Sequence, residues 1–161
     1  MKFFRKIICF FSLLWDFSLR SKLTKQNFKY LNQGMKIIIN TPNAPAPIGP
    51  YNQAVLVGNT LYTSGQIALD PKTMELVTES IEVETQVVME NLKAVLAAAD
   101  MTFANVIKTS IFVSDMHNFS KINAIYGQYF DEATAPARET VEVANLPKFV
   151  NVEISMIAVK A

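Results

Sequence analysis

The sequence has very little cysteine or histidine, with only Cys9 and His117 among 161 residues. A lone cysteine cannot form an internal disulfide, and one histidine with one cysteine cannot supply a tetrahedral zinc site. Charged residues are also sparse at 18%, whereas 50% of the residues are hydrophobic, a composition typical of a folded chain. We therefore exclude a disulfide-stapled secreted scaffold and a Cys/His metal centre, and the length predicts a single domain.

Proline is absent from residues 1–34, and this segment differs from the rest of the chain in charge as well. It holds 7 of the 15 basic residues and one acid, Asp16, a net charge of +6. Residues 35–161 carry 8 basic and 13 acidic residues, a net charge of −5. A negatively charged body argues against binding along a phosphate backbone, so we expect no nucleic-acid partner. The compositional boundary is at Gly34–Met35.

Residues 1–34 admit three interpretations. Three basic residues precede the apolar run from Ile7 to Trp15, as in a targeting peptide, but nine residues are too few to span a bilayer. The other two interpretations are a basic helix on a membrane surface and an upstream extension wrongly joined to a protein that begins at Met35. We favour the extension because Met35 opens a strand pattern of its own. We then expect a cytoplasmic protein whose residues 35–161 need no membrane.

Hydrophobic periodicity over residues 35–161 predicts an α+β domain with the element order βββαβαββ. Two amphipathic helices are expected, one starting at Ser80 and one capped by Asn118 and ending near Glu132. The expected strands are Lys36–Asn40, Gln53–Val57, Thr60–Ser64, Asn105–Val113, Arg138–Val143 and Val150–Val159. Two helices cover only one face of such a mostly antiparallel sheet. Since the other face is also apolar, we predict a homo-oligomer.

Two charged residues in the predicted strands are candidates for chemistry. Arg138 is either a surface arginine paired with Glu139 or Glu142, or a planar fork that binds a substrate carboxylate. Glu153 lies within the most apolar strand of the chain. It is either plainly exposed or lines a cleft between subunits, where its pKa would rise and it would carry protons.

Other polar positions are less specific. Tyr51 closes a proline-rich loop, and Ser64–Gly65 ends the third strand, where a glycine permits close approach to a ligand or simply makes a turn. His117 precedes a helix, and we expect it to be structural. There is no Ser/His/Asp triad, Walker loop or dinucleotide fingerprint.

Three strings in the sequence closely resemble the RidA/YjgF family of reactive intermediate deaminases. They are PIGPYNQA at 47–54, SGQI at 64–67 and PARETVEVANLPKFVNVEISMIAV at 136–159. The resemblance implies a chorismate-mutase-like fold, assembled as a homotrimer with active sites between subunits. It also implies hydrolysis of 2-imino acids, released as enamines by pyridoxal-phosphate dehydratases, to 2-oxo acids and ammonia without a cofactor or metal.

The resemblance also assigns site residues. Arg138 matches the arginine that binds the substrate carboxylate, and Glu153 matches the acid that positions water. The matching pocket-lining positions are Tyr51, Ser64, Gly65 and Asn123. Two positions depart from the family: Thr140 stands where many members have cysteine, and Glu139 replaces a small residue. Because neighbouring strand residues point to opposite faces, we expect Glu139 to point away from Arg138.

Two other classes of function stay open from the sequence. One is a ribonuclease or inhibitor of translation, against which the −5 charge and the lack of a histidine pair argue. The other is a noncatalytic trimer, chaperone-like or sensing small carboxylates through Arg138. Only a deaminase would accelerate the release of ammonia and oxo acid.

Overall fold

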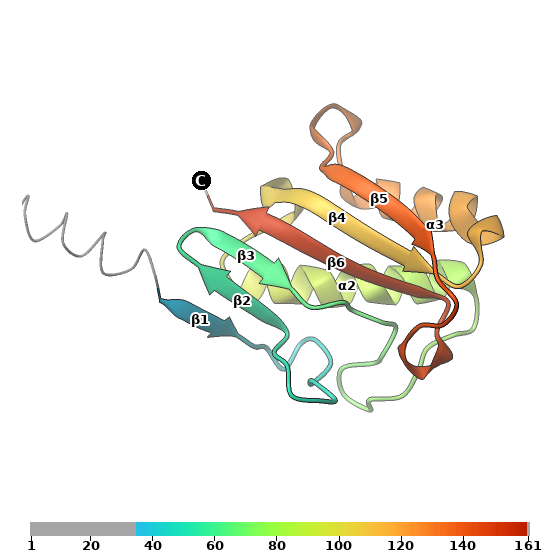
Figure 1. Ribbon diagram of the computed structural model, residues 1–161, viewed down its shortest axis with the longest axis horizontal. Coiled ribbons are helices and arrows are strands. Elements are labelled where there is room, and N and C mark those ends of the chain that lie inside the picture. The colour runs from blue at the N-terminus through green and yellow to red at the C-terminus, as the bar shows by residue number, and fades with distance from the viewer. Residues whose placement is uncertain (1–34, 161) are drawn as a thin grey trace, which may run out of the picture. The chain divides into compact units, whose positions relative to one another are not determined.

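The computed structural model describes residues 35–160 and contains one six-stranded sheet with two helices (Figure 1). The interpretations of residues 1–34 therefore lie outside the described residues. The helices are α2, Ile81–Ala98, and α3, Phe119–Tyr126. The strands are β1, Lys36–Ile39; β2, Ala54–Val57; β3, Thr60–Thr63; β4, Val106–Val113; β5, Ala137–Glu142; and β6, Val152–Val159. The predicted order βββαβαββ is confirmed.

The sheet has the strand order β1-β2-β3-β6-β4-β5. All neighbouring strands are antiparallel except β4 and β5, which α3 connects. A parallel pair needs such a crossover because its chain must return to the same end of the sheet. A hairpin joins β2 to β3 at Gly58–Asn59, and the positive φ of 62° at Gly58 suits a residue without a Cβ.

Both helices pack on one face of the sheet (Figure 1). The α2 helix begins where the Ser80 side chain accepts a hydrogen bond from the Val83 amide at 3.2 Å. Its apolar stripe contacts the buried side chains of the central strands, which alternate along β4 and β6. The core contains, among others, Leu61, Val88, Leu92, Val95, Leu96, Ile111, Val113, Ile122, Val152, Ile154 and Met156.

The predicted start of α3, directly after Asn118, is confirmed, but the predicted capping by Asn118 and the predicted end are wrong. The chain starts to turn earlier, because the Asp115 carboxylate accepts from the His117 amide at 2.9 Å and begins a 3₁₀ turn. Asn118 therefore has helical backbone angles and makes no capping bond. The helix ends at Tyr126 rather than near Glu132, since Gly127 follows and favours a change to 3₁₀ turns.

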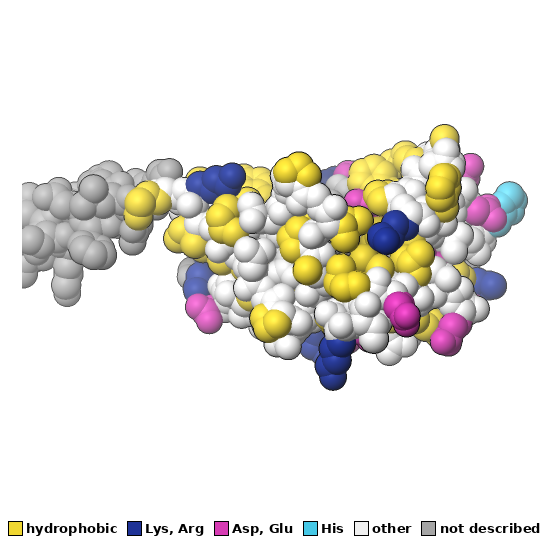
Figure 2. All heavy atoms as spheres, turned by 90° about the horizontal axis from the view of Figure 1, so that it is seen from below, with side chains coloured by type: hydrophobic (Ala, Val, Ile, Leu, Met, Phe, Trp, Pro, Cys, Tyr) yellow, Lys and Arg dark blue, Asp and Glu magenta, His cyan; other side chains and the backbone are white. Residues whose placement is uncertain are grey.

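The face of the sheet that the helices leave uncovered, here called the open face, carries apolar and charged side chains. Strand alternation places Tyr62, Val141 and Glu153 on it, opposite the buried side chains of the same strands. Tyr62 is 49% exposed and Val141 is 42% exposed. A smaller cluster of Ile67, Leu69, Leu146 and Val150 lies under the loops. Hydrophobic atoms at this loop-rich edge of the sheet are visible in Figure 2.

Candidate functional site

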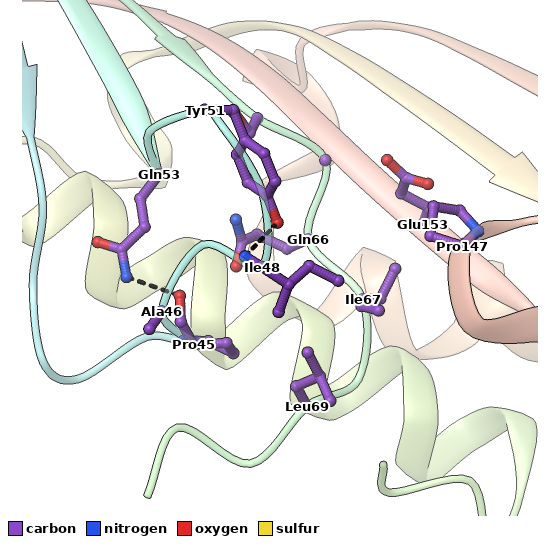
Figure 3. A pocket seen from close by; sticks show the side chains of 12 residues that line it. Pro45, Ala46, Ile48, Tyr51, Gln53, Gln66, Ile67, Leu69, Pro147 and Glu153 are labelled. Atoms are coloured by element: carbon purple, nitrogen blue, oxygen red, sulfur yellow. Dashed lines mark hydrogen bonds between the residues drawn. The ribbon is translucent and has the colours of Figure 1, made fainter. Parts of the chain in front are cut away.

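A pocket of about 330 Å³ lies between the proline-rich loop, the segment that follows β3 and the start of β6 (Figure 3). Its walls are mainly apolar, with Glu153 and Tyr51 as the polar groups of greatest chemical interest. The lining residues are Pro45, Ala46, Ile48, Tyr51, Gln53, Ser64, Gly65, Gln66, Ile67, Leu69, Pro147 and Glu153. The pocket thus contains four of the predicted site residues: Tyr51, Ser64, Gly65 and Glu153.

Gln53 fixes the proline-rich wall of this pocket. Its side chain is buried, and its Nε2 donates to the carbonyls of Thr41, Ala44 and Pro45 at 3.0, 3.0 and 2.8 Å. Its Oε1 accepts from the Thr41 amide at 2.6 Å. A loop rich in proline has few amides with which to bond to itself, so one buried amide side chain supplies the missing partners. In the sequence, nothing distinguishes Gln53 as a residue of the site.

Tyr51 and Ser64 connect the same wall to the sheet. The Tyr51 hydroxyl accepts from the Ile48 amide at 3.3 Å, which holds the ring over the pocket (Figure 3). Ser64 Oγ donates to the Asn52 carbonyl at 2.6 Å, so this hydroxyl is already occupied by the backbone. Ser64 therefore shapes the pocket, whereas Tyr51 presents an aromatic face to it.

Glu153 projects from β6 into the pocket, on the open face of the sheet. Burial of this carboxyl raises its pKa above the ordinary value of 4.5. Gly65 makes room for it: a Cβ at Gly65 would lie 2.6 Å from the Cδ carbon of Glu153. Paired backbone bonds of 2.8 and 3.1 Å between Gln66 and Ile154 hold the two segments together. Gly65 therefore permits the close approach of the Glu153 side chain in its observed position.

Glu84 anchors the start of β6 from the other side of the sheet. This carboxylate is fully buried and accepts from the Asn151 amide at 2.7 Å, from Asn151 Nδ2 at 2.8 Å and from the Val152 amide at 3.3 Å. Such charge-assisted bonds compensate for burial of the carboxylate. In sequence, Glu84 is merely one of two acids in the first turn of α2, and nothing there distinguishes it.

Arg138 belongs to a second group of residues, on the helix side of the sheet. Its Nη1 donates to Asn123 Oδ1 at 2.8 Å. Its guanidinium carbon lies 5.0 Å from the ring centroid of Tyr126 and 5.7 Å from that of Phe119. Thr140 follows two residues later on β5, so its side chain leaves the strand on the same face.

No carboxylate pairs with Arg138 within residues 35–160, so the surface ion pair that the sequence left open is not formed there. Glu139 points to the opposite face, as expected, where it contacts Lys108 and Ser110. These partners lower the pKa of the Glu139 carboxyl. Glu142 instead accepts a hydrogen bond from the Met116 amide at 2.8 Å. Arg138 is therefore a cation with an amide and two aromatic rings around it.

The predicted site residues thus divide between two faces of the sheet. Arg138 lies opposite Thr109 in the register, and Thr109 is aligned with the core residue Met156. Glu153 is an odd number of residues from Met156 on the same strand, so its side chain leaves by the other face. Arg138 and Glu153 therefore leave the sheet on opposite faces.

The remaining titratable residues between positions 35 and 160 form no further centre. The His117 side chain is almost fully exposed, and its Nδ1 lies 2.7 Å from Asp115 Oδ1. The hydrogen bond and charge of Asp115 raise the pKa of His117. In the described part of the chain no group of three His, Cys, Asp or Glu side chains is placed to hold a metal ion. None of the helices between residues 35 and 160 has both the length and the apolar character needed to cross a bilayer.

Several known proteins are similar in sequence to this chain. The family model described as Endoribonuclease L-PSP matches residues 41–160. A RutC family protein of Synechocystis is 58% identical over 123 residues, which cover 76% of this chain and 95% of the relative. A 2-iminobutanoate/2-iminopropanoate deaminase of Salmonella typhimurium is 47% identical over 128 residues, which cover 78% of this chain and 99% of the relative.

Solved structures share the fold. A Rid family protein of Yersinia pestis has a TM-score of 0.76 and 46% identity, with 78% of this chain and 100% of the other covered. Escherichia coli TdcF, solved with bound serine, has a TM-score of 0.73 and 42% identity, with 78% of this chain and 99% of TdcF covered. These proteins define a class of small α+β proteins to which this fold conforms. The chain belongs to the RidA/YjgF family.

Proposed function

We propose that the protein hydrolyses reactive 2-imino acids, such as 2-iminobutanoate and 2-iminopropanoate, to 2-oxo acids and ammonia. The observation that carries the proposal is Arg138, whose guanidinium has no carboxylate partner within residues 35–160. A planar guanidinium can donate two parallel hydrogen bonds to the carboxylate that all 2-imino acids share. The deaminase name of the Salmonella relative and the serine bound to TdcF, itself a small amino acid, support the same ligand class.

The proposal includes a homotrimer of chorismate-mutase-like subunits with its sites between chains. Arg138 and Glu153 leave opposite faces of the sheet, so a complete site needs the arginine group of one chain and the Glu153 pocket of its neighbour. The exposed apolar side chains of the open face offer a surface for that contact. We assign the substrate-binding roles to Arg138, Asn123 and Thr140 on one side and to Tyr51, Ser64 and Gly65 on the other.

The chemistry follows from the charge of the substrate. Protonation of the enamine at carbon gives an iminium ion, whose carbon is already electrophilic. Arg138 holds the carboxylate, and Glu153 orients a water molecule and accepts its proton as the oxygen bonds to that carbon. Glu153 returns this proton to the nitrogen of the resulting tetrahedral carbinolamine and accepts the hydroxyl proton, while the C–N bond breaks, ammonia leaves and the C=O bond of the 2-oxo acid forms. The raised pKa of Glu153 makes it a better proton acceptor than an ordinary carboxylate.

The test couples threonine dehydratase to this protein and traps the released imine with semicarbazide. We expect the wild type to suppress trapping and Arg138→Ala to lose that effect by about two orders of magnitude, because the substrate carboxylate is then unbound. A wild type that binds 2-oxobutanoate without suppressing trapping would contradict catalysis and favour a noncatalytic carboxylate-binding trimer. RNA hydrolysis that survives Arg138→Ala in a nuclease-free preparation would favour the ribonuclease named by the family model.

A further inference from the structure

One face of α3 is directed at Arg138. Phe119, Asn123 and Tyr126 occupy positions i, i+4 and i+7 of that helix, the spacing that aligns side chains along one stripe. Asn123 accepts the only hydrogen bond that the structure gives the guanidinium within residues 35–160. The two rings lie within 6 Å of the guanidinium carbon, at 5.7 and 5.0 Å, the range of a cation–π interaction.

The Tyr126 ring is itself held in place. It is buried, its hydroxyl donates to Thr109 Oγ1 at 3.2 Å, and it packs against Phe130 with ring centroids 4.7 Å apart. Burial raises the pKa of the Tyr126 hydroxyl, so the ring beside Arg138 is a neutral phenol. Phe119 is 38% exposed and covers the guanidinium from the outer part of the helix.

We propose that Phe119 and Tyr126 form an aromatic bracket that positions the Arg138 guanidinium for its carboxylate ligand. The proposal rests on the proposed function and adds positioning residues to it. Aromatic rings attract the face of a guanidinium but accept none of its in-plane N–H bonds. With Asn123 bound to Nη1, the remaining N–H groups stay available for a planar carboxylate that approaches in the plane of the fork.

The bracket also explains how an arginine can remain unpaired. Arg138 is a flexible side chain in a neighbourhood that contains Glu139 and Glu142, and a free guanidinium would find one of these carboxylates. Glu139 leaves by the other face, and Glu142 is engaged by the Met116 amide. The rings then hold the cation without neutralising it, which preserves its charge for the ligand.

The test uses the full chain and 2-oxobutanoate, the expected product, so that binding is measured without turnover. In titration calorimetry we expect Phe119→Leu to weaken binding about five- to tenfold, the size of a partly exposed cation–π contact. In the dehydratase-coupled assay the same variant should raise KM by a similar factor and leave kcat within about twofold. Phe119→Tyr, which restores an aromatic ring, should recover both values.

A matched control separates positioning from stability. Phe103 is also partly buried and packs edge-on against Tyr129 and Phe130, with ring centroids 5.2 and 5.3 Å apart. The rings that make cation–π contacts with Arg138 are those of Phe119 and Tyr126. Phe103→Leu should lower the Tm at least as much as Phe119→Leu and leave 2-oxobutanoate binding unchanged.

The bracket is overturned if Phe119→Leu binds as tightly as the wild type, or if Phe103→Leu weakens binding equally. Wild-type turnover together with unchanged Phe119→Leu binding would reject the bracket alone. Weakened binding by Phe119→Leu, in a protein whose wild type shows no turnover, would support the bracket and reject deamination. A wild type that neither binds nor turns over would overturn both.

Discussion

At the residue scale, Glu153 makes opposite contributions to stability and to chemistry. Burial raises its folded-state pKa above 4.5, so as pH increases the unfolded chain releases this proton first. The ionised carboxylate therefore destabilises the fold once the pH exceeds 4.5, and this effect disappears at lower pH, where both states are protonated. A residue that costs stability in this way is a better proton acceptor than an exposed glutamate.

We predict that Glu153→Gln raises the Tm at pH 7.5 and raises it much less at pH 4, as measured by scanning calorimetry. Its kcat in the imine assay should fall by about a hundredfold or more, because a proton acceptor is lost. The wild-type kcat should decline on the acid side at a pH above 4.5, where the carboxyl begins to be protonated. Equal Tm values at both pH values would contradict the assigned cost of ionisation.

The strand positions of Arg138 and Glu153 were predictable, but the neighbours of these residues were not. Arg138 and Glu153 were identified from strings that resemble a family, and both occur where strand patterns predicted them. The rings beside Arg138 and the carboxylate of Glu84 have no signature of their own. Each is an ordinary helix residue in sequence, and only the packing of the helix on the sheet brings it to its partner.

At the scale of elements, Glu84 links α2 to β6 through bonds to two consecutive amides. We predict that Glu84→Ala lowers the free energy of unfolding by about 3 kcal/mol, since Asn151 and Val152 then lose a buried acceptor. Urea denaturation followed by circular dichroism measures this change. Glu82→Ala, which removes a partly exposed acid of the same turn, should cost at most about 0.5 kcal/mol. Equal losses in the two variants would contradict the anchoring role of Glu84.

The elements themselves were mostly predictable, and the exceptions have local causes. Alternation in Val150–Val159 and helical spacing from Ser80 identified β6 and α2 within two residues of their observed limits. The end of α3 was missed because Gly127 follows the helix, and capping by Asn118 was wrongly expected because Asp115 already starts the turn. The position of β6 between β3 and β4 was not predictable, because strand order depends on contacts that are distant in sequence.

At the scale of the whole molecule, the division of the site between two faces leads to a prediction about mixed assemblies. Arg138→Ala and Glu153→Gln should each be inactive alone. When the two chains are unfolded together and refolded in equal amounts, sites with both wild-type groups should form at about one quarter of the wild-type number, as random assembly requires. The dehydratase-coupled assay measures this recovery.

The control replaces the Glu153→Gln partner by a chain that carries both substitutions. Mixed with Arg138→Ala, that chain supplies no arginine, and no activity should return. Light scattering should give the refolded mixture and the wild type the same mass, three times that of the 18.0 kDa chain. An absence of recovery in properly assembled mixtures would contradict a site shared between chains.

The way Gln53 holds the proline-rich loop has a consequence for how the residues of this pocket can change in evolution. The Gln53 side chain ties the loop to the start of β2 through backbone carbonyls of the loop and the Thr41 amide, and the side chains of Ala46 and Ile48 take no part in these bonds. Ala46 and Ile48 can therefore be exchanged for larger or smaller residues while the wall that carries them stays in place. Substrate preference and scaffold stability are in this way separable, and new specificities can arise here with few compensating substitutions.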